Sequence, residues 1–258
     1  MKTIIFFDID NTIYDNLQRR IPPQTKQLIL DLAQNKNFEL GLATGRNLSN
    51  TKIMGDLLPL FKYRVLLNGA VAMINDEIIY QAKIKKTDIK AALEIAKANN
   101  YNVGMMALND DAVNKYDERV NDVMYQRRGV APKVDSDFYL KHEIYQLWIL
   151  ADDDDKLSEI ERQLPQFKAY AWHKDGADFL NPAHNKMDAI AKLLENEEAY
   201  RLICVGDGIN DVAMIEKADV GIAMANSRFE TLKEKANLIA PYIGLDQLFD
   251  FFKSNNLI

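Results

Sequence analysis

Cysteine and histidine are scarce in this chain of 258 residues, which has one cysteine and three histidines. A single cysteine, Cys204, excludes an internal disulfide and fits a reducing compartment. It lies in an apolar run, which favours a small buried side chain over a reactive thiolate. The histidines (His142, His173 and His184) lack the spacing of metal ligands, so a zinc or iron site is disfavoured.

Long apolar runs and an excess of positive charge are also missing. No stretch approaches the ~20 apolar residues that span a bilayer, and the apolar run at the N-terminus is too short for the core of a signal peptide. The formal net charge of −6 argues against a general nucleic-acid binder, because such proteins use basic patches to neutralise phosphates. We therefore expect a cytoplasmic monomer or weak homodimer without a membrane or nucleic-acid partner.

Strand and helix patterns alternate in the two end portions of the chain. Four short runs rich in β-branched and aromatic residues are typical of buried parallel strands: 3–7, 38–43, 64–67 and 201–205. The middle portion differs, because it contains helical patterns at 87–99, 117–128 and 153–164 between paired strand patterns. The sequence predicts an α/β fold with a parallel-sheet core formed by 1–80 and 181–258 and an inserted α+β domain over 81–180.

Polar motifs stand at or near the carboxyl ends of the predicted core strands. Asp8 and Asp10 follow the first strand, and side chains two positions apart on extended backbone face the same side. Two carboxylates held together repel each other, so they require a bound cation or a shared proton. Taken alone, this Asp-x-Asp-x-Thr segment fits an Asx-turn equally well.

The second and third motifs are weaker signals. Thr44 offers a hydroxyl, and Gly45 lets the backbone approach an anion at the positive end of any helix that begins beyond Arg46. Lys186 stands at the start of a predicted helix after the inserted domain, and in isolation a surface lysine is the simpler interpretation.

The fourth motif is the most specific. The run Gly206-Asp207-Gly208-Ile209-Asn210-Asp211 follows a buried strand, and a simple polar turn would not require two acids and an amide. Ligands bind to open α/β sheets at the carboxyl ends of the strands, so all of these motifs point to one site.

In this order and spacing, the motifs resemble those of the haloacid dehalogenase (HAD) superfamily, and the insertion resembles the large α/β cap (type C2) of its Cof-type branch, class IIB. The resemblance implies a Rossmann-like core and a Mg²⁺-dependent phosphatase that acts on a small phosphorylated metabolite through an aspartyl-phosphate. The resemblance implies that Asp8 is the nucleophile and Asp10 the general acid/base. It implies Mg²⁺ held by Asp8, Asp207 and the backbone carbonyl of Asp10, with Asp211 supporting the metal shell. It also implies that the phosphoryl group is bound by Thr44, Gly45, Arg46, Lys186 and Asn210.

Three positions depart from the family pattern. Asn11 and Met187 stand where glycine is usual, and Asn226-Ser227 replaces an Asn-Ala pair. Asparagine tolerates unusual backbone angles, so we expect Asn11 to preserve the loop.

Further substrate contacts and two other functions remain open. Trp172, His173, Lys174 and Arg46 are candidate substrate contacts, although packing or surface charge explains each equally well. A phosphomutase or phosphotransferase would use the same scaffold. A phosphometabolite-binding protein would keep the same fold without catalysing a reaction.

Overall fold

The computed structural model describes residues 1–125 and 131–258, which divide into two compact units. Unit 1 comprises Met1–Arg46, Asn50–Tyr80 and Asn185–Ile258, and unit 2 comprises Asn47–Ser49 and Gln81–His184. The sequence-based division had assigned residues 47–49 and 181–184 to the core instead.

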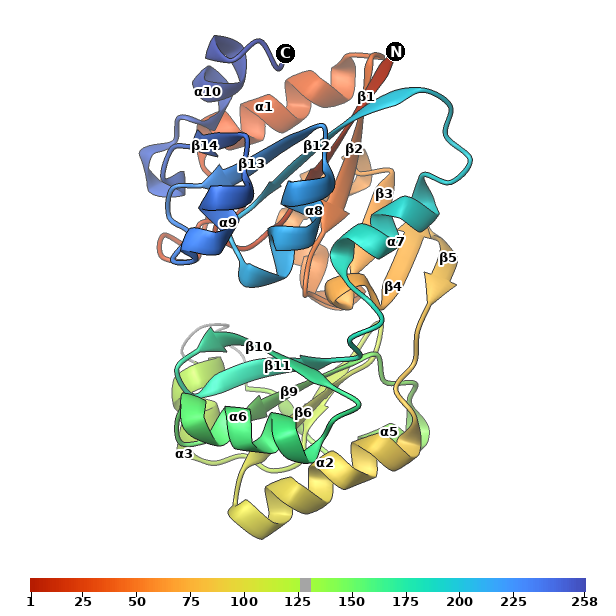
Figure 1. The fold of residues 1–258 in the computed structure, drawn as a ribbon, viewed down its shortest axis with the longest axis vertical. Helices are drawn as coiled ribbons and strands as arrows, with labels where there is room; N and C mark the ends of the chain where they lie inside the picture. The colour runs from red at the N-terminus through yellow and green to blue at the C-terminus, as the bar shows by residue number, and fades with distance from the viewer. Residues whose placement is uncertain (126–130) are drawn as a thin grey trace. The chain divides into compact units, whose positions relative to one another are not determined.

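Unit 1 is built on an eight-stranded sheet with the order β14-β13-β12-β1-β2-β3-β4-β5 (Figure 1). Strands β14 to β3 run parallel, and β4 turns back antiparallel to β3. The predicted α/β fold with a parallel core sheet is therefore confirmed. The strands are β1 (Lys2–Phe7), β2 (Phe38–Ala43), β3 (Tyr63–Leu66), β4 (Val71–Ile74), β5 (Glu77–Gln81), β12 (Tyr200–Gly206), β13 (Val220–Met224) and β14 (Leu238–Ala240).

Helices bury both faces of this sheet. Along β1, Ile5 and Phe7 pack in one apolar cluster with α1 and α10, whereas Ile4 and Phe6 pack in another with α7, α8 and α9. Burial on both sides explains why the strands read as continuous apolar runs. The helices are α1 (Pro23–Gln34), α7 (Lys186–Leu193), α8 (Val212–Lys217), α9 (Glu230–Lys235) and α10 (Leu248–Ser254), with 3₁₀ helices η1 (Leu48–Leu60), η2 (Leu67–Gly69), η4 (Ile209–Asp211) and η5 (Ile243–Leu245).

Unit 2 holds a six-stranded sheet with the order β10-β11-β9-β6-β7-β8, antiparallel except for the β7–β8 pair. Its elements are α2 (Lys86–Asn99), β6 (Asn102–Met106), β7 (Asp111–Val113), α3 (Glu118–Val120), the π-helix η3 (Asn121–Tyr125), β8 (Lys133–Val134), α5 (Phe138–Lys141), β9 (Gln146–Leu150), α6 (Asp154–Gln163), β10 (Lys168–His173) and β11 (Gly176–Leu180). The sequence analysis missed β8 and α5. The predicted helix over 117–128 ends in residues 126–128, which lie outside the described residues.

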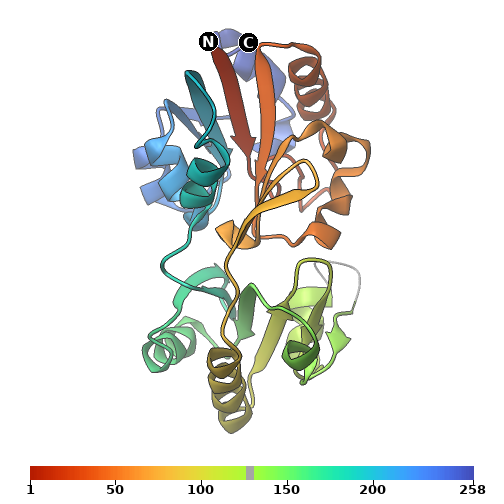
Figure 2. The same cartoon turned by 90° about the vertical axis from the view of Figure 1, so that its right-hand side faces the viewer.

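Strand β1 occupies the centre of the core sheet and positions the motifs. Phe7 is in register with Val205 of β12 on one side and with Leu42 of β2 on the other, and Figure 2 shows β1 and β2 side by side. The chain leaves β1 toward β2 and later returns to β12 on the opposite side, so β1 lies at a topological switch point, where ligands bind in such sheets. Within residues 1–125 and 131–258, no helix combines the length and apolar character needed to cross a membrane.

Candidate active site

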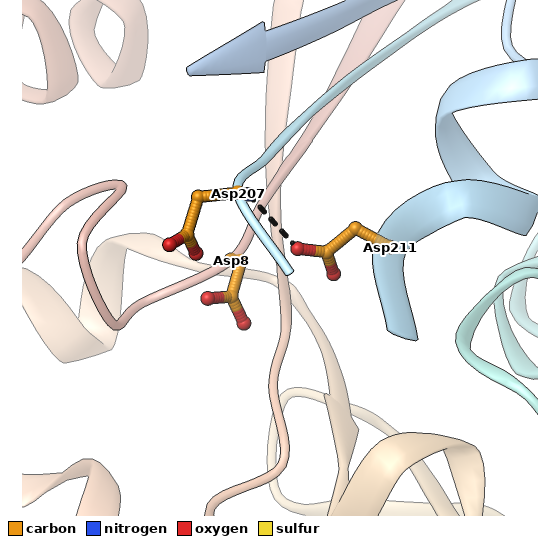
Figure 3. A group of neighbouring side chains, drawn as sticks. All are labelled: Asp8, Asp207 and Asp211. Carbon is orange, nitrogen blue, oxygen red and sulfur yellow. Dashed lines mark hydrogen bonds between the residues drawn. The ribbon is translucent and has the colours of Figure 1, made fainter. Parts of the chain in front are cut away.

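Three carboxylates meet beyond the carboxyl ends of β1 and β12. Asp8, Asp207 and Asp211 each offer one oxygen, and these oxygens lie within 4.8 Å of one another. Figure 3 shows the carboxylates of Asp8 and Asp207 turned into the same space, with Asp211 directed toward them from the start of α8. Negative charges this close repel strongly, so the arrangement requires positive charge beside it.

Lys186 supplies one buried positive charge to this centre. The side chain of Asn185 caps α7 by accepting a hydrogen bond from the backbone N–H of Asp188, which fixes Lys186 in the first turn. Its Nζ donates to Oδ1 of Asp8 at 2.7 Å and to Oδ1 of Asp211 at 2.6 Å. Burial alone would lower the pKa of Lys186, but the charges of Asp211 and Asp8 outweigh burial and raise this pKa above its ordinary value.

The carboxyls of Asp8 and Asp207 resist ionisation. Burial raises the pKa of Asp8 to about 7, because the attraction of Lys186 only partly offsets the lost solvation and the repulsion by Asp211. Burial, together with the charges of Asp8 and Asp211, also raises the pKa of Asp207 well above its ordinary value. The single ammonium group thus leaves an excess of negative charge among the three carboxylates. A divalent cation with oxygen ligands would neutralise this excess.

The oxygens of Asp211 already have protein donors. While Oδ1 accepts from Lys186, Oδ2 accepts from the backbone N–H groups of Asp207 at 3.0 Å and Gly208 at 2.8 Å. Figure 3 draws the bond between Asp207 and Asp211. A Cβ atom at Gly206 would lie 2.5 Å from this Oδ2, so the loop requires glycine there. Asp211 therefore shapes the loop and holds Lys186, which agrees with a supporting role.

Arg46 contacts the side chain of Asp10. Its Nε and Nη2 donate to Oδ2 and Oδ1 of Asp10 at 2.8 Å and 2.7 Å, and its Nη1 donates to the carbonyl of Asn50 at 3.2 Å. Such a planar fork fixes the orientation of the carboxylate that it binds. The sequence analysis expected Arg46 to bind the phosphate. In the structure its guanidinium instead binds Asp10, the residue expected to act as general acid/base. Thr44 lies fully buried beside it, and its Oγ1 accepts from the N–H of Arg46 at 3.2 Å.

Asn68 belongs to this site and was missed by the sequence analysis. It follows β3 in a turn where Leu67, Asn68 and Gly69 have φ angles of 52°, 56° and 100°. Its Oδ1 accepts a hydrogen bond from Nδ2 of Asn210 at 2.7 Å. A left-handed conformation costs a residue with a side chain about 1–2 kcal/mol, and asparagine less, so asparagine suits this turn better than most residues would. The available signal was the Asn-Gly pair that directly follows the predicted strand at 64–67.

Asn11 adopts a left-handed conformation with φ 54°, as expected for an asparagine in place of glycine. Asn226 holds this loop, because its Nδ2 donates to the carbonyl of Asn11 at 2.9 Å while its Oδ1 accepts from the N–H of Ile243 at 3.0 Å. Cys204 is fully buried, and burial raises its thiol pKa, so the interpretation as an unreactive core residue is confirmed.

The candidate substrate contacts in unit 2 lie on or beside the β10–β11 hairpin. Nε1 of Trp172 donates to Oδ1 of Asp178 at 3.0 Å, and Nδ1 of His173 accepts from the N–H of Asp175 at 3.2 Å. The side chain of Lys174 is 80% exposed. These contacts stabilise the hairpin, and a role in substrate binding stays a prediction.

The fold and the acidic cluster define an α/β protein whose candidate site lies at the carboxyl edge of a parallel sheet. The chain belongs to the family of haloacid dehalogenase-like hydrolases, whose sequence pattern matches residues 5–244. The resemblance stated from the motifs is thereby confirmed.

Relatives and solved structures extend this similarity over nearly the whole chain. YkrA of Bacillus subtilis (strain 168), which carries a provisional name as a phosphatase, is 28% identical and covers 94% of this chain and 93% of its own. YcsE of the same organism, a 5-amino-6-(5-phospho-D-ribitylamino)uracil phosphatase, is 23% identical and covers 92% of this chain and 88% of its own. The HAD subclass IIB sugar phosphatase BT4131 shares the fold with a TM-score of 0.87, at 23% identity and with 100% of both chains covered.

Proposed function

We propose that this chain is a Mg²⁺-dependent phosphatase that hydrolyses a small phosphate monoester, such as a sugar phosphate, through an aspartyl-phosphate on Asp8. The observation that carries the proposal is the buried ion cluster in which Lys186 bridges Asp8 and Asp211 beside Asp207. The substrates named for YcsE and BT4131 support a small phosphorylated metabolite. Unit 2 would be the C2-type cap.

The proposed reaction assigns a role to each of these side chains. An oxygen of Asp8 attacks phosphorus in line, so that an O–P bond forms to Asp8 while the bond to the leaving alkoxide breaks. Asp10, carrying a proton delivered with the substrate, would give it to that alkoxide and would later take one from the water that hydrolyses the acyl phosphate. A dianionic ester repels Asp8 by about 4 kcal/mol per pair of unit charges at 4 Å and an effective dielectric constant near 20. Lys186 offsets this repulsion, and Thr44 and Asn210 would bind the phosphoryl oxygens.

Magnesium fits the donor set of this site. The site offers carboxylate oxygens from Asp8 and Asp207, and the backbone carbonyl of Asp10 would complete the protein ligands. When bound, the ion supplies the positive charge that the carboxylates and the transferring phosphoryl group both require.

A panel of phosphate esters assayed with Mg²⁺ tests the proposed function. We expect phosphate release that stops in EDTA and returns with Mg²⁺ but not with Zn²⁺. Transfer of the phosphoryl group to an acceptor sugar, without release of inorganic phosphate, would show a phosphotransferase. No release from any ester, with phosphometabolites still bound, would show the binding protein without activity.

The metal-free protein should lose stability as pH rises through the titration of Asp8. Burial raises the pKa of Asp8 from 3.8 to about 7. At a pH between these two values, Asp8 is therefore protonated in the folded state but ionised in the unfolded state. The contribution of this group to stability is therefore present below about pH 4 and is lost by about pH 7, a change of roughly 4 kcal/mol. Thermal unfolding in EDTA at several pH values, compared with Asp8→Asn, isolates this slope.

Magnesium should reverse that loss, since the ion favours the ionised carboxyl. We expect Mg²⁺ to raise the melting temperature more at about pH 7.5 than at about pH 5. An Asp8→Asn protein with the same pH slope as the wild type would contradict the assignment of the slope to Asp8.

Replacing Arg46 by lysine should lower kcat by between about tenfold and a hundredfold and leave KM nearly unchanged, because lysine lacks the planar fork that orients Asp10. Steady-state kinetics with inorganic phosphate as inhibitor gives both constants. Arg20→Lys is the matched control, because Arg20 is exposed and its Nε donates to Gln18. A rise in KM and in the inhibition constant with an unchanged kcat would instead assign Arg46 to the phosphate.

A further inference from the structure

The turn after β3 is tied to the Thr44-Gly45-Arg46 loop by backbone hydrogen bonds. The N–H of Leu67 donates to the carbonyl of Arg46, and the N–H of Asn68 donates to the carbonyl of Thr44, both at 3.0 Å. In this turn the chain leaves β3 through positive φ angles at Leu67, Asn68 and Gly69. A Cβ atom at Gly69 would lie 2.3 Å from the carbonyl oxygen of Asn185, so this turn also packs directly against the start of the Lys186 helix.

The side chain of Asn68 joins two motifs that lie far apart in the sequence. It is 2% exposed, and its Oδ1 accepts from Nδ2 of Asn210, which is 142 residues away. A Cβ atom at Gly45 would lie 3.0 Å from Nδ2 of Asn68, so the amide packs over the glycine of the Thr44-Gly45 loop.

Asn210 is confined at the other end of its amide as well. A Cβ atom at Gly208 would lie 2.2 Å from Oδ1 of Asn210. The hydrogen-bonded amides of Asn68 and Asn210 thus form a row in space. Gly45 leaves room for the amide of Asn68 at one end, and Gly208 leaves room for the amide of Asn210 at the other. A turn that needed only a left-handed asparagine would require neither the bond to Asn210 nor the space above Gly45.

We propose that Asn68 is a positioning residue of the phosphoryl-binding site, which holds the side chain of Asn210 in place against the Thr44-Gly45 loop. This inference rests on the proposed function, because it assigns a partner to a residue of that same site. Asn68 acts through Asn210, so its loss is expected to weaken the binding of phosphate more than it changes the fold.

Asn68→Gly tests the proposal, because glycine keeps the left-handed backbone and removes the amide. With p-nitrophenyl phosphate as substrate and Mg²⁺ present, we expect KM and the inhibition constant of inorganic phosphate to rise by about tenfold. Asn75→Gly is the matched control, since Asn75 has φ 53° in the β4–β5 turn. We expect the control to leave both constants unchanged and the two variants to have similar melting temperatures.

A double-mutant cycle with Asn210→Ala separates positioning from direct contact. If Asn68 acts through Asn210, then Asn68→Gly changes the phosphate constant by less than about twofold once Asn210 is alanine. An undiminished tenfold effect in that background would overturn the proposal, as would constants equal to those of the Asn75→Gly control. A wild-type protein that hydrolyses no ester would instead refute the proposed function, and phosphate binding measured by calorimetry would still test Asn68.

Discussion

Replacing Asp8 by asparagine is expected to lower phosphate release by at least about a thousandfold, because an amide cannot form the acyl phosphate. The protein should stay folded, since the substitution removes a carboxyl whose pKa burial raises to about 7. Phosphate release with Mg²⁺ and thermal unfolding of the same preparation measure both effects.

The covalent intermediate gives this prediction a second readout. Acid quenching of the wild-type reaction with a phosphate-labelled substrate should leave label on the protein, and hydroxylamine should remove it. Asp15→Asn is the matched control, because Asp15 is 1% exposed in the same loop and its Oδ1 accepts from the N–H groups of Leu17 and Gln18. The nucleophile assignment fails if Asp8→Asn keeps wild-type activity or still acquires label.

The core fold was predictable from sequence because its strands are short apolar runs that stop at polar motifs. The predicted strand at 38–43 has the observed bounds of β2, and those at 3–7 and 201–205 differ from β1 and β12 by one residue at their ends. Strands buried on both faces carry this signal along their whole length. The sequence also placed Asp8, Thr44 and the loop after β12 at one edge, because parallel neighbours end together.

Contacts between distant parts of the chain were not predictable in the same way. No local pattern indicates that the guanidinium of Arg46 meets Asp10 or that Asn210 donates to Asn68, since both depend on how neighbouring strands pair. The helix considered beyond Arg46 is the 3₁₀ helix η1, interrupted at Gly55 with φ 54°. The strands β8 and β14 have only two and three residues, too few for a period to show.

Replacing Lys186 by methionine is expected to abolish activity and to destabilise the metal-free protein by about 3–5 kcal/mol near neutral pH. The ammonium group is fully buried and bridges Asp8 and Asp211, so its loss leaves these two buried carboxyls without the positive charge that they share. Lys62→Met is the matched control, because Lys62 also bridges two carboxylates, Glu39 and Glu197, but is 34% exposed. A solvent-screened pair of this kind contributes at most about 1 kcal/mol.

The pH dependence decides whether charge or packing causes the destabilisation. Lys186 lowers the pKa of Asp8, so this pKa must rise further in Lys186→Met, and the loss of stability should shrink toward about pH 4, where the Asp8 carboxyl is protonated. Adding Asp8→Asn to Lys186→Met should restore part of the stability near neutral pH without restoring turnover. Urea unfolding of the three variants at both pH values measures these differences. An equal loss at both would mean that Lys186 fills space in the core and does not neutralise the site.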